Sequence, residues 1–231
     1  AYIDHQPMLF GDWQSSVCQF AAKYAQQSST HYLLWCQSTY HFSVQLFALW
    51  LADKVVVLPP NIQPDNLQRY ASSVDAVVTD LTAESSSFSA INKNIYYAND
   101  VEIHFTNTRL PVAQPYRELH AVRLILFTSG SSGEPKAVSR TLAQLEAELA
   151  GLHTEFAISP VPSNDGATIS ATTVIGAVPH HHIYGLLFRV LWPLVEGWPF
   201  VNEIYDYPEP LLACLHPVSY THLTLPTKRI V

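Results

Sequence analysis

The residues with the clearest chemistry lie in one short segment, Thr128–Ala137, which we call the glycine loop. It holds two of the chain's eight glycines, four hydroxyl residues and one lysine within ten positions. Glycines let successive backbone N–H groups converge on one point, hydroxyls add donors, and a lysine adds a mobile positive charge. This combination predicts a loop that holds phosphates. A flexible Gly/Ser turn would explain the glycines but not the Pro135-Lys136 ending.

The spacing within the glycine loop separates it from three other glycine motifs. A Walker loop needs Lys directly after its second Gly, whereas Lys136 comes three residues after Gly133. The dinucleotide pattern G-x-G-x-x-G is absent. The hydrolase elbow G-x-S-x-G is one residue longer than the segment from Gly130 to Gly133. The sequence therefore favours a phosphate loop of another type.

A second candidate site is the run of three histidines, His180–His182, between Pro179 and Gly185. A zinc site is conceivable, but three consecutive side chains cannot all point at one ion from a strand or a helix. No Asp or Glu accompanies them closely in the sequence, so we assign no metal ligand. We expect His180 and His181 to be partly solvated or hydrogen-bonded fillers.

Together the two segments resemble the adenylate-forming superfamily of acyl-CoA synthetases, luciferases and peptide-synthetase adenylation domains. The phosphate loop of that family reads two Ser/Thr, Gly, two Ser/Thr, Gly, any residue, Pro, Lys and Gly/Ala, and Thr128–Ala137 matches it at every position. The family motif P-x-x-H-x-x-G matches Pro179–Gly185, downstream as expected. The stretch 42–60 is also similar to the helix and strand that precede the loop in this family, so the resemblance covers most of residues 30–200.

The resemblance implies a ligase that joins a carboxylic acid, fatty or aryl, to ATP in the presence of Mg²⁺ and releases pyrophosphate. The acyl group then passes to a thiol of coenzyme A or of an acyl carrier protein. The residues implied to hold the β- and γ-phosphates are Thr128, Ser129, Gly130, Ser131, Ser132, Gly133 and Lys136. His182 is implied to lie near the carboxylate end of the acid, which makes His182 and Lys136 the catalytic candidates. The resemblance places such an enzyme in fatty acid metabolism.

The elements that must position these residues alternate between strand and helix signals, which predicts an α/β fold with a mostly parallel sheet and flanking helices. Strand signals cover residues 31–35, 55–58, 76–79, 122–127 and 172–175, and helical spacing covers 44–51, 65–70, 142–156 and 184–192. We expect Pro193 to end or kink the last helix. Thr141 and Gln144 form a capping-box pattern at the start of the helix predicted over 142–156. The glycine loop is thus predicted to connect a strand to a helix.

Composition excludes several classes of protein. With 48% hydrophobic residues in 231, the chain is not intrinsically disordered. A net charge of −7 and the lack of a basic tract argue against a nucleic-acid partner. The odd, widely spaced Cys18, Cys36 and Cys214 favour a cytoplasmic protein with free thiols. Charged residues interrupt the most apolar stretch, 42–60, so we expect no transmembrane segment.

The last fourteen residues, Val218–Val231, resemble the translation of a sequencing-library adapter. We therefore expect a partial AMP-binding domain over 1–217 and an artefact over 218–231, with a genuine strand-like terminus as the alternative. The family's later motifs (adenine contact, Mg²⁺-binding acid, ribose-binding acid and lid lysine) are not found after His182. This predicts the incomplete N-terminal portion of the family's large domain, without activity by itself. The alternative function is a non-catalytic anion-binding α/β module.

Overall fold

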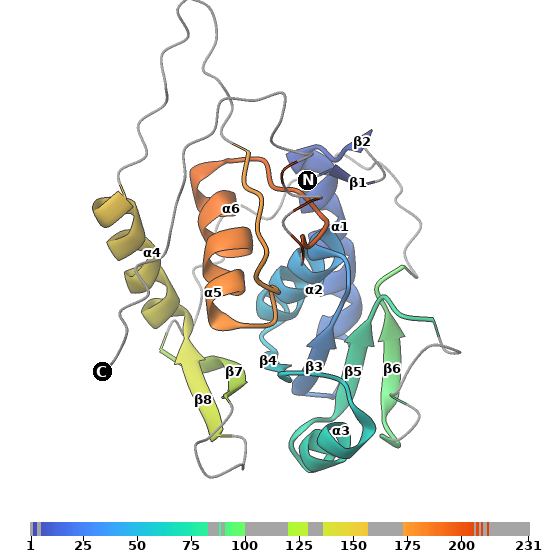
Figure 1. Ribbon diagram of the computed structural model, residues 1–231. Coiled ribbons are helices and arrows are strands. Elements are labelled where there is room, and N and C mark those ends of the chain that lie inside the picture. The colour runs from blue at the N-terminus through green and yellow to red at the C-terminus, as the bar shows by residue number, and fades with distance from the viewer. Residues whose placement is uncertain are drawn as a thin grey trace, which may run out of the picture.

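The computed structural model describes residues 2–3, 6–82, 88, 91–99, 120–128, 136–156, 173–205, 207, 209 and 212. In this part of the chain, six strands form one sheet in the order β6-β5-β3-β4-β7-β8 (Figure 1). The strands are β3 (His31–Trp35), β4 (Val55–Leu58), β5 (Ala76–Thr79), β6 (Asn94–Tyr97), β7 (Val122–Thr128) and β8 (Lys136–Thr141). All neighbours are parallel except β7 and β8. A separate antiparallel pair joins β1 (Tyr2–Ile3) and β2 (Gln6–Pro7).

Helices cover both faces of this sheet (Figure 1). They are α1 (Phe10–Ala25), α2 (Thr39–Leu51), α3 (Pro64–Tyr70) with the 3₁₀ turn η1 (Ala71–Ser73), α4 (Leu142–Phe156), α5 (Ile183–Gly185), the π-helical segment η3 (Leu186–Leu191) and α6 (Trp192–Glu196). Buried side chains of α1, α2, α4 and η3 form one hydrophobic cluster with one face of the sheet. Those of α3 form a second cluster on the other face. The sheet is therefore the middle of three layers.

The strands carry continuous apolar runs because both of their faces are buried. Tyr32 and Leu34 of β3 join the α1–α2 side, whereas Leu33 between them joins the α3 side. Val56 and Val57 of β4 divide between the two faces in the same way. This alternation is typical of a parallel sheet covered on both sides. The predicted α/β class with a mostly parallel sheet and flanking helices is confirmed.

Several local predictions are also confirmed. The strands predicted at 31–35, 55–58 and 76–79 have the bounds that the structure shows, and helices occupy all four regions of helical spacing. The capping box at the start of α4 is complete. The Thr141 N–H donates to Gln144 Oε1 at 3.0 Å, and the Gln144 N–H donates to Thr141 Oγ1 at 3.2 Å.

Three local predictions were wrong or incomplete. The glycine loop connects β7 to the strand β8, not to a helix, and β8, in which no residue is buried, carries no hydrophobic signal. The helix does not end at Pro193, because the Trp192 N–H donates five residues back to Leu187 O and the turn before the proline widens. In the predicted strand 172–175, Thr172 lies outside the described residues, and Val174 makes an isolated bridge to Phe200.

Two leucines of α2 give a matched test of this packing. Leu46 is fully buried, whereas Leu51 near the end of the same helix is 40% exposed. We expect Leu46→Ala to lower the free energy of unfolding by about 2–5 kcal/mol, and Leu51→Ala to lower it by about 0.5 kcal/mol or less. Urea unfolding of both variants measures the difference. Equal losses would contradict the burial described here.

Candidate functional site

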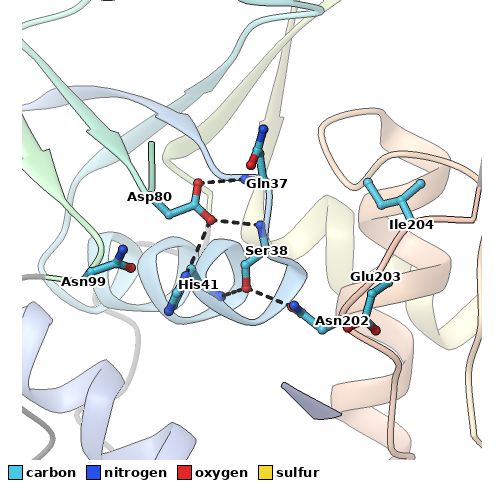
Figure 2. A pocket seen from close by; sticks show the side chains of 8 residues that line it. All are labelled: Gln37, Ser38, His41, Asp80, Asn99, Asn202, Glu203 and Ile204. Atoms are coloured by element: carbon cyan, nitrogen blue, oxygen red, sulfur yellow. Dashed lines mark hydrogen bonds and ion pairs between the residues drawn. The ribbon is translucent and has the colours of Figure 1, made fainter. Parts of the chain in front are cut away.

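The strand order creates a switch point between β3 and β5. The chain leaves β3 toward β4 on one side and leaves β5 toward β6 on the other. The carboxyl ends of two such strands flank the crevice where open α/β sheets bind ligands. A cleft of about 500 Å³ opens here (Figure 2). It is lined by Gln37, Ser38, His41, Asp80, Asn99, Asn202, Glu203 and Ile204.

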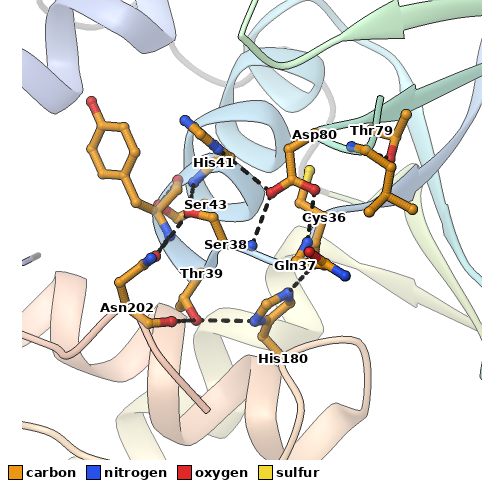
Figure 3. A network of polar contacts seen from close by, with 12 residues as sticks. Cys36, Gln37, Ser38, Thr39, His41, Ser43, Thr79, Asp80, His180 and Asn202 are labelled. Carbon is orange, nitrogen blue, oxygen red and sulfur yellow. Dashed lines mark hydrogen bonds and ion pairs between the residues drawn. The ribbon is translucent and has the colours of Figure 1, made fainter. Parts of the chain in front are cut away.

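Asp80, directly after β5, holds the backbone that follows β3. Its carboxylate accepts hydrogen bonds from the N–H groups of Gln37 and Ser38, at 2.8 and 2.9 Å. His41 Nδ1 lies 3.5 Å from the same carboxylate (Figure 3). Burial by itself would raise the pKa of Asp80, but the adjacent His41 and the hydrogen bonds from the Ser38 and Gln37 N–H groups outweigh it and lower the pKa. Asp80 therefore stays ionised and fixes the start of α2.

Asn202 connects a distant segment to the same helix start. Ser38 Oγ, the N-cap of α2, accepts from the His41 N–H and donates to Asn202 Oδ1 at 2.8 Å. Thr39 Oγ1 donates to the Asn202 carbonyl at 2.8 Å. The buried Arg189 donates to Thr39 Oγ1 and to the backbone carbonyl of residue 203, at 3.1 and 2.8 Å. The cleft walls are thus held together mainly by hydrogen bonds between groups remote in sequence.

The segment Pro179–Gly185, which we call the histidine turn, packs against the end of β3. His180 Nε2 and His181 Nε2 lie 2.8 and 3.0 Å from the Cys36 carbonyl oxygen. A carbonyl only accepts, so both Nε2 atoms donate. Of the two alternatives predicted for these residues, partial solvation or hydrogen bonding, the structure shows hydrogen bonding, because their side chains are only 0% and 5% exposed. Both side chains are buried because Trp35 packs on the His181 ring and Phe42 packs on the His180 ring.

Burial keeps both of these imidazoles neutral. It lowers the pKa of His180 to about 4, although the hydrogen bond to Cys36 acts in the opposite direction. Burial also lowers the pKa of His181 well below its ordinary value, and a charge on the adjacent His180 would lower it further. At neutral pH each ring therefore carries one N–H, which points at Cys36.

His182 differs from its neighbours because its side chain is exposed. It is the N-cap residue of α5; its N–H donates to the Pro179 carbonyl at 3.1 Å, and its own carbonyl accepts from the Leu186 N–H at 2.8 Å. Gly185 closes this turn, since a Cβ there would lie 2.1 Å from the Pro179 oxygen. The close approach explains why the motif needs a glycine six residues after its proline.

The glycine loop is attached to the sheet by a hairpin. Thr128 at the end of β7 and Lys136 at the start of β8 are partners in the antiparallel register, and the Lys136 side chain is exposed. The structure thus brings together the two ends of the predicted phosphate loop. The other predicted residues, Ser129, Gly130, Ser131, Ser132 and Gly133, lie outside the described residues. His182 belongs to a separate element, at the start of α5.

The described residues contain neither a cluster suited to a metal ion nor a helix suited to spanning a membrane. In the described ranges, no three His, Cys, Asp or Glu side chains gather into a group suited to a metal ion. We therefore assign no Mg²⁺ ligand to these residues. Cys18 and Cys36 are free thiols, and Cys214 lies outside the described residues. None of the helices described here has the length and apolar character needed to cross a membrane.

Sequence reasoning missed most of the polar network around the cleft. The pair Ser38-Thr39 before an apolar helix is a helix-start signal, and it predicts the N-cap that Ser38 forms. Asp80 directly follows a predicted strand, so its position at the carboxyl edge of the sheet could have been predicted from the sequence. No local signal marks Asn202 or Arg189, because their partners lie on remote segments.

Comparison with known proteins gives one family. The family model described as "AMP-binding enzyme" matches residues 4–228. Among curated proteins, 4-coumarate–CoA ligase of Rhodobacter capsulatus is 36% identical over 73 residues, which are 32% of this chain and 17% of that protein. Sulfoacetate–CoA ligase of Cupriavidus necator is 32% identical over 94 residues, 41% of this chain and 16% of that protein.

Solved structures resemble the fold over almost the whole chain. O-succinylbenzoate coenzyme A synthetase (MenE) from Bacillus subtilis, in complex with AMP, has a TM-score of 0.69 at 18% identity, covering 94% of this chain. ATP-bound MatB from Rhodopseudomonas palustris has a TM-score of 0.66 at 16% identity, covering 89%. The chain spans 54% and 41% of these two structures, so it matches about half the length of such proteins.

The buried histidine pair predicts a specific pH dependence of stability. The pKa of His180 is about 4 in the folded chain and 6.5 when unperturbed, so between these values the unfolded state binds more protons. Above about pH 6.5 the protonation of His180 does not reduce the free energy of unfolding, and as the pH falls from there toward 4 it reduces this free energy progressively. A group that takes up one proton contributes a slope of about 1.4 kcal/mol per pH unit.

We therefore expect the unfolding free energy to fall from pH 7 to pH 5, and to fall less steeply in His180→Phe. The exposed His153 on α4 supplies the matched control, His153→Phe. Urea unfolding at several pH values measures the slopes. The same slope in His180→Phe as in the wild type would contradict the assignment of His180 as a buried neutral imidazole.

Proposed function

The chain belongs to the family of AMP-binding enzymes, and from that premise we propose that its parent protein is an acid–thiol ligase of the acyl-CoA synthetase type. It activates a carboxylic acid with ATP, releases pyrophosphate, and transfers the acyl group from the acyl-adenylate to a thiol. The observation that carries this proposal is the glycine loop at the tip of the β7–β8 hairpin, with Thr128 and Lys136 paired at its base.

The hairpin suits the loop to phosphate binding. Its base is fixed by the ladder pairing of Thr128 with Lys136, so the two ends of the loop are already held together before an anion binds, which lowers the entropy cost of binding. In this proposal the ATP phosphates are held by Thr128, Ser129, Gly130, Ser131, Ser132, Gly133 and Lys136. Backbone N–H groups, hydroxyls and the Lys136 ammonium stabilise the charge that grows on pyrophosphate as the acid attacks. The proposal includes Mg²⁺ bound with the ATP, through residues outside those described.

His182 has a separate role in the proposal, at the carboxylate of the acid. Its exposed side chain stands at the start of α5, on a turn whose other two histidines are buried. An imidazole there donates a hydrogen bond to a carboxylate oxygen and holds the acid in line with the α-phosphate of ATP. Lys136 and His182 thus act on the two anions that the reaction must bring together.

Coenzyme A is the acceptor that we favour, with a carrier-protein thiol as the alternative. Both curated relatives are named as CoA ligases, and their named acids, 4-coumarate and sulfoacetate, are carboxylic acids. We propose a fatty or aryl acid as the substrate and the cytoplasm as the location. The proposal treats residues 1–217 as part of the AMP-binding domain and 218–231 as foreign to it.

The chain by itself is expected to lack adenylation activity, because it spans about half of the related structures. ATP–pyrophosphate exchange with a panel of fatty and aryl acids measures this. We expect exchange from the complete ligase and background exchange from the 231-residue chain. Exchange above background from the shorter chain would sink the claim.

Lys136 tests the glycine loop in the complete ligase. We expect Lys136→Ala to lower kcat for adenylation about 10²-fold, which is the typical cost of removing one donor from a developing anion. Arg140→Ala on the same strand is the matched control. Arg140 is a partly exposed cation that pairs with Glu148 of α4 at 3.9 Å, and it is not one of the predicted phosphate-binding residues. Unchanged kinetics in Lys136→Ala would refute the loop assignment. ATP binding without exchange in the wild-type ligase would favour the non-catalytic module instead.

A further inference from the structure

Two histidines of the histidine turn share one acceptor, and the acceptor lies at the end of the central strand. Cys36 directly follows β3, and its carbonyl receives N–H groups from both His180 and His181 (Figure 3 shows the first). The two positions are variable in the family motif, which specifies His182 alone among the three. The proposed function gives neither residue a role.

We propose that His180 and His181 are positioning residues, which hold the histidine turn on the Cys36 carbonyl so that His182 meets the acid's carboxylate. This inference rests on the proposed function and adds to it. The fixed point is strand β3, which pairs with β4 on one side and β5 on the other. A turn attached there takes its position from a strand that is paired on both sides.

Ring contacts limit how the turn can move. The imidazole of His181 stacks on Trp35 with ring centroids 3.7 Å apart and planes 6° apart. The ring of His180 packs against Phe42 at 4.3 Å, and its Nδ1 lies 3.1 Å from Thr39 Oγ1. The pair is therefore held on the faces of its rings as well as at its nitrogens. Rotation of the turn would break both kinds of contact together.

A simple filling role does not explain an imidazole at position 181. Within the described residues, His181 Nδ1 is buried without a hydrogen-bond partner. Burying that nitrogen costs free energy, and a phenyl ring would stack on Trp35 without this cost. What the imidazole adds is the N–H that Nε2 donates to Cys36. The hydrogen bond therefore accounts for a histidine at this place.

The backbone carries the constraint to His182 within one residue. The His182 N–H donates to the Pro179 carbonyl and the His182 carbonyl accepts from the Leu186 N–H, so His182 is bonded to the start of the turn and to the residue directly after it. Gly185 packs on Pro179 without room for a side chain. A shift of the anchored pair would thus move His182 with it. Displacements of about 1 Å cost about 10²-fold in well-oriented reactions.

Phenylalanine and glutamine variants in the complete ligase separate anchoring from packing. His181→Phe keeps a ring for Trp35 but removes the donor, whereas His181→Gln restores an amide N–H near the Nε2 position. We expect His181→Phe to lower kcat/KM for the acid about 10- to 100-fold, with the KM for ATP within about twofold of wild type. His181→Gln should recover most of the loss. His180→Phe and His180→Gln repeat the test, and the exposed His153→Phe is the control.

Hydrogen exchange of the 231-residue chain supplies a readout that needs no activity. We expect the His182 and Leu186 amides to exchange slowly in the wild type and faster in His181→Phe, while β3 amides keep their protection. A folded His181→Phe variant with wild-type kcat/KM and unchanged hydrogen exchange at these amides would overturn the proposal. A rise in the KM for ATP as large as the fall in kcat/KM for the acid would also overturn it. If the wild-type ligase forms no acyl-adenylate, the proposed function is wrong, and the exchange result alone decides whether the pair anchors the turn.

Discussion

The carbonyl of Cys36 is the point at which the sheet, helix α2 and the histidine turn meet. Buried parallel strands end in backbone groups that must find hydrogen-bond partners without water. After β3 those partners come from distant parts of the chain. The Asp80 carboxylate accepts hydrogen bonds from the N–H groups of Gln37 and Ser38. The Cys36 carbonyl accepts hydrogen bonds from two histidines that lie 144 and 145 residues away in the sequence. Satisfying the end of one strand therefore fixes two remote segments beside it, the residue after β5 and the histidine turn.

The charges of the buried groups around the end of β3 follow from the same need for hydrogen-bond partners. Asp80 stays ionised because N–H donors surround it, whereas burial keeps His180 neutral. The buried Arg189 donates to backbone carbonyls and to Thr39 Oγ1, and its positive charge also opposes protonation of His180. The exposed His182 stands outside this set. The arrangement thus separates the buried groups, whose charge state is set by their surroundings, from the exposed side chain of His182.

The sequence was most informative where structure is local. Continuous β-branched runs such as 55–58, and the Thr141–Gln144 capping box, depend on neighbouring residues and were predicted correctly. The strand β8 was missed because an exposed edge strand needs no apolar alternation, and its pairing with β7 depends on the hairpin register. Helix α1 was also missed, although Trp13, Val17, Phe20 and Tyr24 recur at helical spacing. The contacts of Asn202 and Arg189 lay beyond any local pattern, because they join segments about 150 residues apart.

The two segments that first indicated a function depend on different features of the chain. The glycine loop is recognised by its sequence, and the fold contributes a hairpin base at Thr128 and Lys136. The histidine turn is defined by what it packs on. Within the turn, the close Pro179 carbonyl leaves room only for a glycine at position 185. The side chains at positions 180 and 181 are instead constrained by their contacts with Cys36, Trp35 and Phe42. Residues that a motif leaves variable are therefore constrained in this chain by the end of strand β3. A change at Trp35 or Phe42 would alter which side chains positions 180 and 181 accept, and so where His182 stands.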